Sequence, residues 1–482
     1  MFLPRRHLVR AALFAVFTLV FVLPSRAEER PNVVLIMTDN HGAWTLGCYG
    51  NKDIKTPNLD RMAAEGALFT HAFSNNAVCS PTRATYLTGL MPSQHGVHKY
   101  IHKSVMMGPE AYPTLEEFDT LPQILSENGY VCGLSGKWHL GANMEPQEGF
   151  TFWVTKPEGH TTDFVNQQII ENGEITTLKE HQTPYWTRRG IEFMEQNKDR
   201  PFFLFLAYNG PYGLGKSAIT PPINQYADYY KDKDLPSFTR DTPHPWLHHN
   251  RQMMNNPVAA QKYASEISGI DDGVGEIMAA LKRLGLDENT LVIFTGDQGL
   301  SGGQSGFWGM GDHTRPLTAF DWTMHVPLLV RQPEKIPAGQ RFDQLVSNYD
   351  LLPSVLEYVG LADKQAETPR SPGRNYAPLL RGEEAPWTDE VFYEFENVRA
   401  IRTAEWKYIE RIGQEPNELY HLTEDAGERL NLYGRAAHTE TQQALQKRLH
   451  KFFTTYAEPQ WDLWNGGDAK GGLIMGKEPY GG

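Results

Sequence analysis

The sequence predicts an α/β protein in which parallel strands are covered by helices on both faces. Short apolar runs, each bounded by glycine and polar residues, alternate with segments of helical period. Runs that are apolar throughout are typical of strands buried on both faces, as in parallel sheets. The chain has 482 residues, and its 40% hydrophobic content is sufficient for a large core. The predicted strands are residues 33–37, 131–134, 202–206 and 291–294.

Amphipathic segments between these strands are predicted to form covering helices. The longest spans residues 259–284, and its apolar residues recur at the spacing of one helix face. That face carries Ile267, Ile270, Val274, Ile277 and Leu281. The other predicted helices are residues 57–65, the run that follows Pro81, 121–127 and 186–196.

The composition changes near residue 386, and a smaller second unit is expected there. Segments 391–395, 400–403 and 407–409 alternate apolar and polar residues, which is typical of an antiparallel sheet. A helix is predicted over residues 439–456. We therefore expect a catalytic domain over residues 28–385 and a smaller carboxy-terminal subdomain and tail over residues 386–482.

Two irregular segments remain. Residues 213–257 are polar and rich in proline and histidine, and they are expected either to cover a site or to be a solvated insertion. The glycine-rich tail, residues 458–482, carries Trp461, Trp464 and Tyr480. Packing against the body of the protein is favoured for these aromatic side chains over stacking on sugar rings, because large aromatic residues usually bury area.

The first 27 residues have the pattern of an export signal. Arg5, Arg6 and Arg10 precede an apolar stretch, residues 11–23, and Ala27 ends a small-residue cleavage site. The stretch is too short to span a bilayer comfortably, so a stable membrane anchor is not expected. The mature protein is predicted to begin near residue 28 and to be periplasmic or extracellular.

The net charge and the cysteine content indicate which partners and which disulfide pairing to expect. The net charge is −13 and no basic patch is visible, so nucleic acid is not expected as a partner. Besides Cys79, the chain has Cys48 and Cys132, which either pair or remain two buried thiols. Two thiols are favoured because Cys132 lies in an apolar run that resembles a strand, and buried cysteine often behaves as a small hydrophobic residue.

Polar side chains follow each of the four predicted strands. Because the carboxyl ends of strands in an open α/β sheet form the usual ligand site, these side chains are expected to converge. Four of them carry oxygen donors, which suit Ca²⁺ and, as the second choice, Mg²⁺. The residues, in chain order, are Asp39 and Asn40, Lys137 and His139, Asn209 and Tyr212, and Asp297 and Gln298.

The segment of residues 79–89 combines a cysteine, a proline and an arginine at close spacing. Pro81 suits the first position of a helix, which places Cys79 just before the helix and beside its free backbone amides. A helix start of this kind attracts a sulfate or phosphate group. Arg83, one turn into the helix, is positioned to hold a bound anion.

Residues 79–89 resemble the signature of the formylglycine-dependent (type I) sulfatases, which are arylsulfatase-like members of the alkaline phosphatase superfamily. The resemblance implies that a maturation enzyme oxidises Cys79 to formylglycine, whose hydrate attacks the sulfur of a sulfate ester. It also implies a large mixed sheet between helices with a smaller carboxy-terminal sheet. Further landmarks of the family extend from about residue 31 to about residue 432.

The resemblance assigns roles to the residues at the strand ends. Residues 31–39 and 294–299 are similar to the segments that carry the metal ligands of the family, so Asp39, Asn40, Cys79, Asp297 and Gln298 are the implied ligands. Asn40 stands where an aspartate is usual, and Gln298 where an asparagine is usual. Within residues 136–141, Lys137 is implied to bind a sulfate oxygen and the formylglycine hydroxyl. His139 is implied to take the proton that triggers expulsion of sulfate.

The residues that would meet the leaving group depart from the family pattern. Where a histidine in a Pro-His context is usual, the chain has Asn209 and Tyr212 around Gly-Pro, and where a lysine is usual it has His313 and Arg315. Our hypothesis is that His313 supplies the proton, Arg315 supplies positive charge, and Tyr212, with Asn209, orients the substrate. Structural roles for these residues are an equally open reading, because general-acid catalysis depends on geometry.

The sequence therefore predicts an exported, calcium-dependent sulfatase. A sulfated carbohydrate is the favoured substrate, because eleven tryptophans and an extended loop suit a sugar polymer, and a small sulfate ester is the other candidate. Two alternatives remain open: a phosphodiester or phosphonate monoester hydrolase of the same superfamily, and an inactive sulfated-glycan-binding protein.

Overall fold

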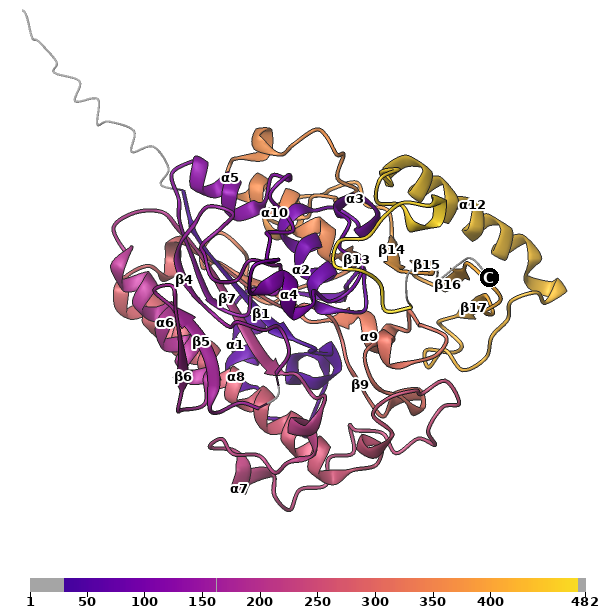
Figure 1. The fold of residues 1–482 in the computed structure, drawn as a ribbon, viewed down its shortest axis with the longest axis horizontal. Helices are drawn as coiled ribbons and strands as arrows, with labels where there is room; N and C mark the ends of the chain where they lie inside the picture. The colour runs from indigo at the N-terminus through magenta and orange to yellow at the C-terminus, as the bar shows by residue number, and fades with distance from the viewer. Residues whose placement is uncertain (1–29, 162, 476–482) are drawn as a thin grey trace, which may run out of the picture.

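A computed structural model describes residues 30–161 and 163–475 of the chain. Its centre is a mixed sheet of eleven strands, in the order β11-β2-β12-β8-β1-β7-β3-β4-β5-β6, with β13 paired to β2. Figure 1 shows helices on both sides of this sheet. The strands are β1 (Asn32–Asp39), β2 (Ala67–Phe73), β3 (Val131–Gly136), β4 (Phe150–Thr155), β5 (Gln167–Glu171), β6 (Glu174–Leu178), β7 (Phe202–Pro211), β8 (Thr290–Gly296), β11 (His325–Val326), β12 (Leu328–Arg331) and β13 (Gln340–Ser347).

The four predicted strands form the parallel centre of the sheet. β8, β1, β7 and β3 are neighbours in this order and all run parallel. In the register, Thr38 faces Gly296 and Asp39 faces Pro211, so the strands end at the same edge. The residues that follow these strands therefore lie at one edge of the sheet. Of the antiparallel strands, β2 and β6 were not predicted, because they lack an uninterrupted apolar run.

Side chains of β1 alternate between two cores, one on each face of the sheet. Val34 and Ile36 pack with one cluster, which includes residues of α1, α6 and α8. Val33 and Leu35 pack with a second, which includes residues of α2, α5 and α10. The helices are α1 (Pro57–Ala64), α2 (Cys79–Thr88), α3 (Pro92–His95), α4 (Lys103–Met106), α5 (Leu121–Glu127), α6 (Gln182–Gln196), α7 (Ala227–Tyr230), α8 (Pro257–Leu284), α9 (Asp321–Met324), α10 (Leu351–Tyr358), α11 (Ala377–Leu380) and α12 (Thr439–Tyr456).

The predicted helices are confirmed, with two differences at their starts. α6 begins at Gln182 rather than at Trp186. α2 begins at Cys79, with Val78 as its N-cap, so Cys79 is the first residue of the helix rather than the residue before it. Pro81 is tolerated two residues further on, because the amides of a first turn need no partner within the helix.

A four-stranded antiparallel sheet follows the large one, as the alternating segments predicted. It consists of β14 (Glu390–Phe395), β15 (Val398–Thr403), β16 (Trp406–Arg411) and β17 (Glu418–His421). α12 packs on it through Leu445, Leu449 and Phe453, as seen at the right of Figure 1. A two-stranded ribbon, β9 (Ser301–Gly302) and β10 (Trp308–Gly309), lies after β8.

The remaining expectations concern the thiols and the termini. All three cysteines are free, with Cys132 buried and Cys48 half-buried. Trp461 and Trp464 contact the body: His98 Nε2 lies 2.9 Å from the Trp461 carbonyl, and Trp464 Nε1 donates to the Glu396 carbonyl at 3.1 Å. Tyr480 and the predicted signal, residues 1–27, lie outside the described residues. Within the described ranges, no helix is both long and apolar enough to cross a membrane.

Candidate active site

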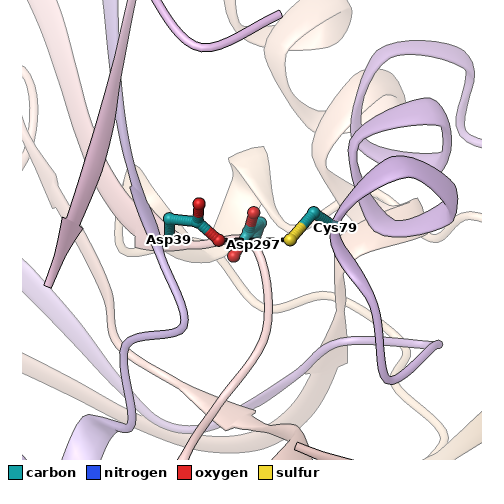
Figure 2. Close-up of side chains that lie close together, drawn as sticks. All are labelled: Asp39, Cys79 and Asp297. Carbon is teal, nitrogen blue, oxygen red and sulfur yellow. Dashed lines mark hydrogen bonds between the residues drawn. The ribbon is translucent and has the colours of Figure 1, made fainter. Parts of the chain in front are cut away.

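The carboxyl edge of the sheet brings three functional side chains together from distant parts of the chain. Asp39 ends β1, Asp297 follows β8, and Cys79 begins α2. Figure 2 shows the two carboxylates and the sulfur pointing toward one another. One ligand atom from each lies within 4.8 Å of the others, and all three residues are buried.

Cys79 is held by two of the predicted ligands. Its Sγ lies 3.2 Å from Asp39 Oδ1, and Gln298 Nε2 lies 3.1 Å from the same Sγ. Gln298 Nε2 also contacts Asn40 Oδ1. Asn40 has a φ of 59°, a conformation in which asparagine is more readily found than most residues. The five ligands that the resemblance implies, Asp39, Asn40, Cys79, Asp297 and Gln298, therefore lie close together.

Two buried cations balance the two carboxylates. Lys137 Nζ lies 2.6 Å from Asp39 Oδ2. Arg83 Nε and Nη2 donate to Asp297 Oδ2 at 3.0 and 2.9 Å, and Arg83 Nη1 donates to the Lys137 carbonyl at 2.8 Å. Buried charges require such pairing, because removal from water is costly for each of them.

The electrostatics disfavour a reactive thiolate and favour an added cation. Burial, and then the charge of Asp39, hold the pKa of the Cys79 thiol well above its usual range. An unmodified thiol there is a weak nucleophile, since the thiolate is the reactive form. Burial and the nearby Asp39 carboxylate raise the pKa of Asp297 to about 6, despite the opposing charge of Arg83.

The residues present fit a divalent metal ion. Two carboxylates share a buried space, and hard oxygen ligands of this kind suit Ca²⁺ or Mg²⁺. Asn40 Oδ1 adds an amide oxygen beside them. Gln298 directs its nitrogen toward Cys79 and its Oε1 accepts from Thr82 at 3.1 Å, so it would join the ligands only after its amide rotates.

His139 is buried and is not among the residues that line the cavity over Cys79. Its φ is 64°, and its carbonyl accepts from Ser80 Oγ at 2.8 Å, which ties this loop to the start of α2. The ring is buried, Nε2 lies 3.3 Å from the Ile101 carbonyl, and Nδ1 has no partner among the described residues. Burial, and then the charge of Lys137, hold the pKa of His139 well below its usual range.

A cavity of about 570 Å³ opens over Cys79. Tyr212, His313 and Arg315, which the hypothesis assigns to the leaving group, all line it. The long polar loop lines it as well, through residues 214–215 and 248–252. Of the two readings left open for residues 213–257, the one in which the loop covers a site is therefore confirmed for these two parts.

His313 faces both a donor and an acceptor at one ring nitrogen. The backbone N–H of Met310 donates to Nδ1 at 3.1 Å, and Asp312 Oδ1 lies 3.1 Å from the same atom. Nδ1 therefore has both a backbone N–H and a carboxylate oxygen within hydrogen-bond distance. Arg315 Nη1 donates to the Asp312 carbonyl at 2.9 Å, which fixes the guanidinium beside this pair.

β7 extends to Pro211, so Asn209 lies inside this strand rather than after it, and only Tyr212 follows the strand. Tyr212 lies in the cavity wall, its OH is 3.1 Å from His160 Nδ1, and its N–H donates to the Asp39 carbonyl at 3.0 Å. Asn209 is buried with 1% exposure, does not line the cavity, and has no hydrogen-bond partner for its side-chain amide among the described residues. A contact between Asn209 and substrate stays a prediction.

Several wall residues were not singled out from the sequence. They come from segments with no motif, and only the fold brings them to one cavity. His248 and His249 were noted as part of the loop without a role. Further wall residues include Tyr100, His160, Arg251, Gln252 and Ile474.

Comparison with known proteins agrees with this fold and site. The fold and the buried Asp-Cys-Asp cluster are those of an α/β protein with a candidate metal site at the carboxyl edge of its sheet. The chain matches the family model described as Sulfatase over residues 31–361, and a second, described as N-sulphoglucosamine sulphohydrolase, C-terminal, over residues 313–455. The chain therefore belongs to the sulfatase family and is a sulfuric ester hydrolase.

Three similar proteins illustrate the range of the family and its neighbours. An N-acetylglucosamine-6-O-sulfatase of Bacteroides thetaiotaomicron is 25% identical, over 90% of this chain and 88% of the relative. A structure of a protein in complex with its substrate D-glucosamine-2-N,6-O-disulfate aligns with a TM-score of 0.71 at 22% identity, covering 89% of this chain and 98% of the other. A phosphonate monoester hydrolase of Agrobacterium radiobacter aligns with a TM-score of 0.70 at 22% identity, covering 89% and 97%.

Proposed function

We propose that this protein is an exported sulfatase that removes sulfate from a sulfated carbohydrate, with a formylglycine at position 79 and a bound calcium ion. The observation that carries the proposal is the contact of Cys79 with Asp39, at the floor of a cavity that is open to a substrate. Family membership defines the reaction class. The modification, the metal, the residue roles and the substrate are the proposed part.

The proposed nucleophile arises by modification of Cys79. The pKa of the thiol is raised by burial and by Asp39, which makes the unmodified side chain unsuitable for attack. A formylglycine hydrate supplies a hydroxyl in its place. We infer that a maturation enzyme acts on residues 79–89 before the chain folds, because Cys79 is 6% exposed in the folded protein.

Arg83 and Lys137 are proposed to hold the sulfate group. Both side chains are buried within the cluster and carry positive charge to the position of the nucleophile. Fixed charges in a site without water stabilise developing negative charge more effectively than charges in solvent. When bound, the divalent cation adds positive charge at the sulfuryl oxygens. Asp39, Asn40, Asp297 and, after rotation of its amide, Gln298 would hold it together with position 79.

Proton transfer is assigned to two histidines, one that lines the cavity and one that does not. His313, in the cavity wall, is proposed to protonate the leaving alcohol, while Arg315 supplies charge and Tyr212 orients the substrate. His139, with an unpartnered Nδ1 and a pKa held low by burial, is neutral and available as a base. It is proposed to take the proton that accompanies sulfate release.

A sulfated sugar is the favoured substrate. The cavity volume of about 570 Å³ falls within the range of about 300 to 1,000 Å³ that is typical of small-molecule sites. Support comes from the relative named as an N-acetylglucosamine-6-O-sulfatase and from the neighbour solved with a disulfated glucosamine. The proposed export follows from residues 1–27, which have the pattern of a signal, and the mature protein is proposed to comprise units 28–385 and 386–482.

Release of sulfate from sulfated N-acetylhexosamines, with and without a chelator, tests the proposal. We expect turnover that falls on chelation and returns with calcium. Matched aryl sulfate and aryl phosphonate esters test the alternative suggested by the phosphonate monoester hydrolase neighbour. A higher kcat/KM on the phosphonate would overturn the proposal, as would binding of sulfated sugars without any turnover by the matured protein.

A further inference from the structure

A second cavity, of about 540 Å³, lies between α12, β14 and the segment of residues 370–374. It shares no residue with the cavity over Cys79. Its wall carries four cationic side chains and one acidic side chain, Glu390. The cationic residues are Arg370, Arg374, Arg448 and Lys451. We refer to this cavity as the α12 groove.

Two of the four cations are already paired. Arg374 Nη2 lies 2.6 Å from Asp350 Oδ2, and Arg448 Nε lies 2.9 Å from Glu390 Oε2. Arg370 and Lys451 are exposed, and within the described part of the chain neither side chain forms an ion pair. The groove therefore has two uncompensated positive charges, although the protein as a whole has a net charge of −13.

Aromatic rings form the platform beside these charges. Phe452 stacks on Phe392, with ring centroids 3.7 Å apart and planes 10° apart, and packs on Tyr456 at 4.9 Å. The Arg370 guanidinium lies 5.6 Å from the centre of the Tyr456 ring. Phe452 and Tyr456 are each partly exposed. A partly exposed aromatic surface can cover the apolar face of a sugar ring, while the adjacent cations can pair with sulfate groups.

We propose that the α12 groove is a second binding site for a sulfated polysaccharide. The ligand class rests on the proposed function, because the catalytic cavity would act on sulfate groups of the same polymer. Ser371 Oγ donates to the Gly89 carbonyl at 2.7 Å, so the groove segment adjoins the end of α2 opposite Cys79. At about 1.5 Å per residue, this helix separates the two sites by roughly 15 Å. A polymer held in the groove raises the effective concentration of its other sulfate groups at Cys79.

Affinity electrophoresis through gels that contain a sulfated polysaccharide, its desulfated form or duplex DNA tests the groove. The double variant Arg370→Ala/Lys451→Ala removes both unpaired cations. The control, Lys179→Ala/Lys198→Ala, removes two exposed lysines that flank α6. Two exposed ion pairs are expected to change the dissociation constant about tenfold. We expect only the sulfated polymer to retard the native protein and the control. For the groove variant, we expect a dissociation constant for this polymer that is about tenfold higher.

Kinetics separate the groove from the catalytic site. We expect the groove variant to release sulfate from a small sulfated sugar at the native rate and to show a raised KM on the polymer with an unchanged kcat. Equal retardation of the native protein and the groove variant would overturn the groove proposal, and so would retardation by DNA alone. Absence of sulfate release from every small substrate by the native protein would instead contradict the proposed function.

Discussion

Lys137 Nζ and Asp39 Oδ2 form a buried ion pair of 2.6 Å at the centre of the site. Arg83 pairs with Asp297 in the same way, at 2.9 Å. The protein therefore neutralises its two candidate metal ligands with its own cations, and the same cations are the proposed binders of the sulfate group. In the proposed metal-bound state, the ion and Lys137 would together stabilise the Asp39 carboxylate.

Lys137→Met is expected to remove sulfate release and to destabilise the protein. Loss of one partner leaves the buried Asp39 carboxylate unpaired, which costs about 3 to 5 kcal/mol. Calcium is expected to restore most of the stability, because the ion neutralises Asp39, but not the activity, because the ammonium is absent. Chemical unfolding with calcium and with a chelator measures the first effect, and sulfate release measures the second.

Lys262→Met is the matched control for this experiment. Lys262 is also buried and pairs with Glu266 at 3.0 Å, within α8. Its loss is expected to destabilise the protein without any additional rescue by calcium beyond that of the native chain. If calcium rescued both variants equally, or neither, the proposed metal position beside Asp39 would be wrong.

Asn40→Asp is expected to tighten calcium binding while weakening the metal-free protein. Asn40 Nδ2 donates to the Tyr212 carbonyl at 2.8 Å, and a carboxylate cannot make this bond. Leaving that buried carbonyl unpaired costs about 1 to 3 kcal/mol. The added charge strengthens an oxygen site for calcium. Calorimetric titration measures the affinity for calcium, and thermal melting with a chelator measures the stability of the metal-free protein. A weaker affinity for calcium would contradict the assignment of Asn40 as a ligand.

His313→Ala is expected to affect substrates according to their leaving group. General-acid catalysis contributes about 10² to 10⁴ in rate, and an alcohol with a high pKa depends on it most. We therefore expect a large fall in kcat on a sugar sulfate and a small one on 4-nitrophenyl sulfate, whose leaving group needs little protonation. His249→Ala, another cavity histidine, is the control and is expected to show no such dependence. An equal fall on both substrates in His313→Ala would exclude the role as acid.

The strands that could be predicted from the sequence are those that a continuous run of apolar residues defines. The buried runs of β1, β3, β7 and β8 are apolar throughout, and their common edge follows from their parallel direction. The convergence of Asp39 and Asp297 could be predicted for that reason, whereas Cys79, at the start of α2, was placed with them by the resemblance of residues 79–89 to the sulfatase signature. β6 could not, because four of its five side chains are exposed and it is defined by pairing with β5.

The cavity wall could not be predicted, because it is assembled from segments without motifs. Tyr100 follows α3, Arg251 lies in the long loop, and Ile474 belongs to the tail. Ile474 is positioned by Glu396, whose carboxylate accepts the backbone N–H of Ile474 and of Met475. Contacts of this kind depend on pairings between distant segments, which have no periodic signature in the chain.

The pH dependence of stability is expected to reflect a buried triad away from the active site. Lys407 Nζ lies 2.6 Å from Glu428 Oε1 and also pairs with Asp321, so one ammonium serves two carboxylates. Burial raises the pKa of Glu428 to about 8, Lys407 opposes this rise, and the Asp321 carboxylate reinforces it. The folded state therefore binds a proton that the unfolded state releases above its ordinary pKa of 4.5.

Stability is consequently expected to fall as the pH rises from about 4.5 to about 8, with a contribution from this group of at most about 1.4 kcal/mol per pH unit. Glu428→Gln mimics the protonated form and is expected to reduce this slope. Glu440→Gln, on the exposed first turn of α12, is the control and should leave it unchanged. Denaturant unfolding across this pH range measures the slope, and an unchanged slope in Glu428→Gln would contradict the assignment.

The central claim is that position 79 carries an aldehyde rather than a thiol in the active protein. Trypsin cuts after Arg61 and Arg83, so residues 62–83 form one peptide that holds Cys79. The mass of this peptide, from protein produced in its native host, tests the claim most directly. We expect the mass of formylglycine and a modified fraction that rises in step with sulfate release. A fully active protein whose peptide retains the thiol mass would contradict it.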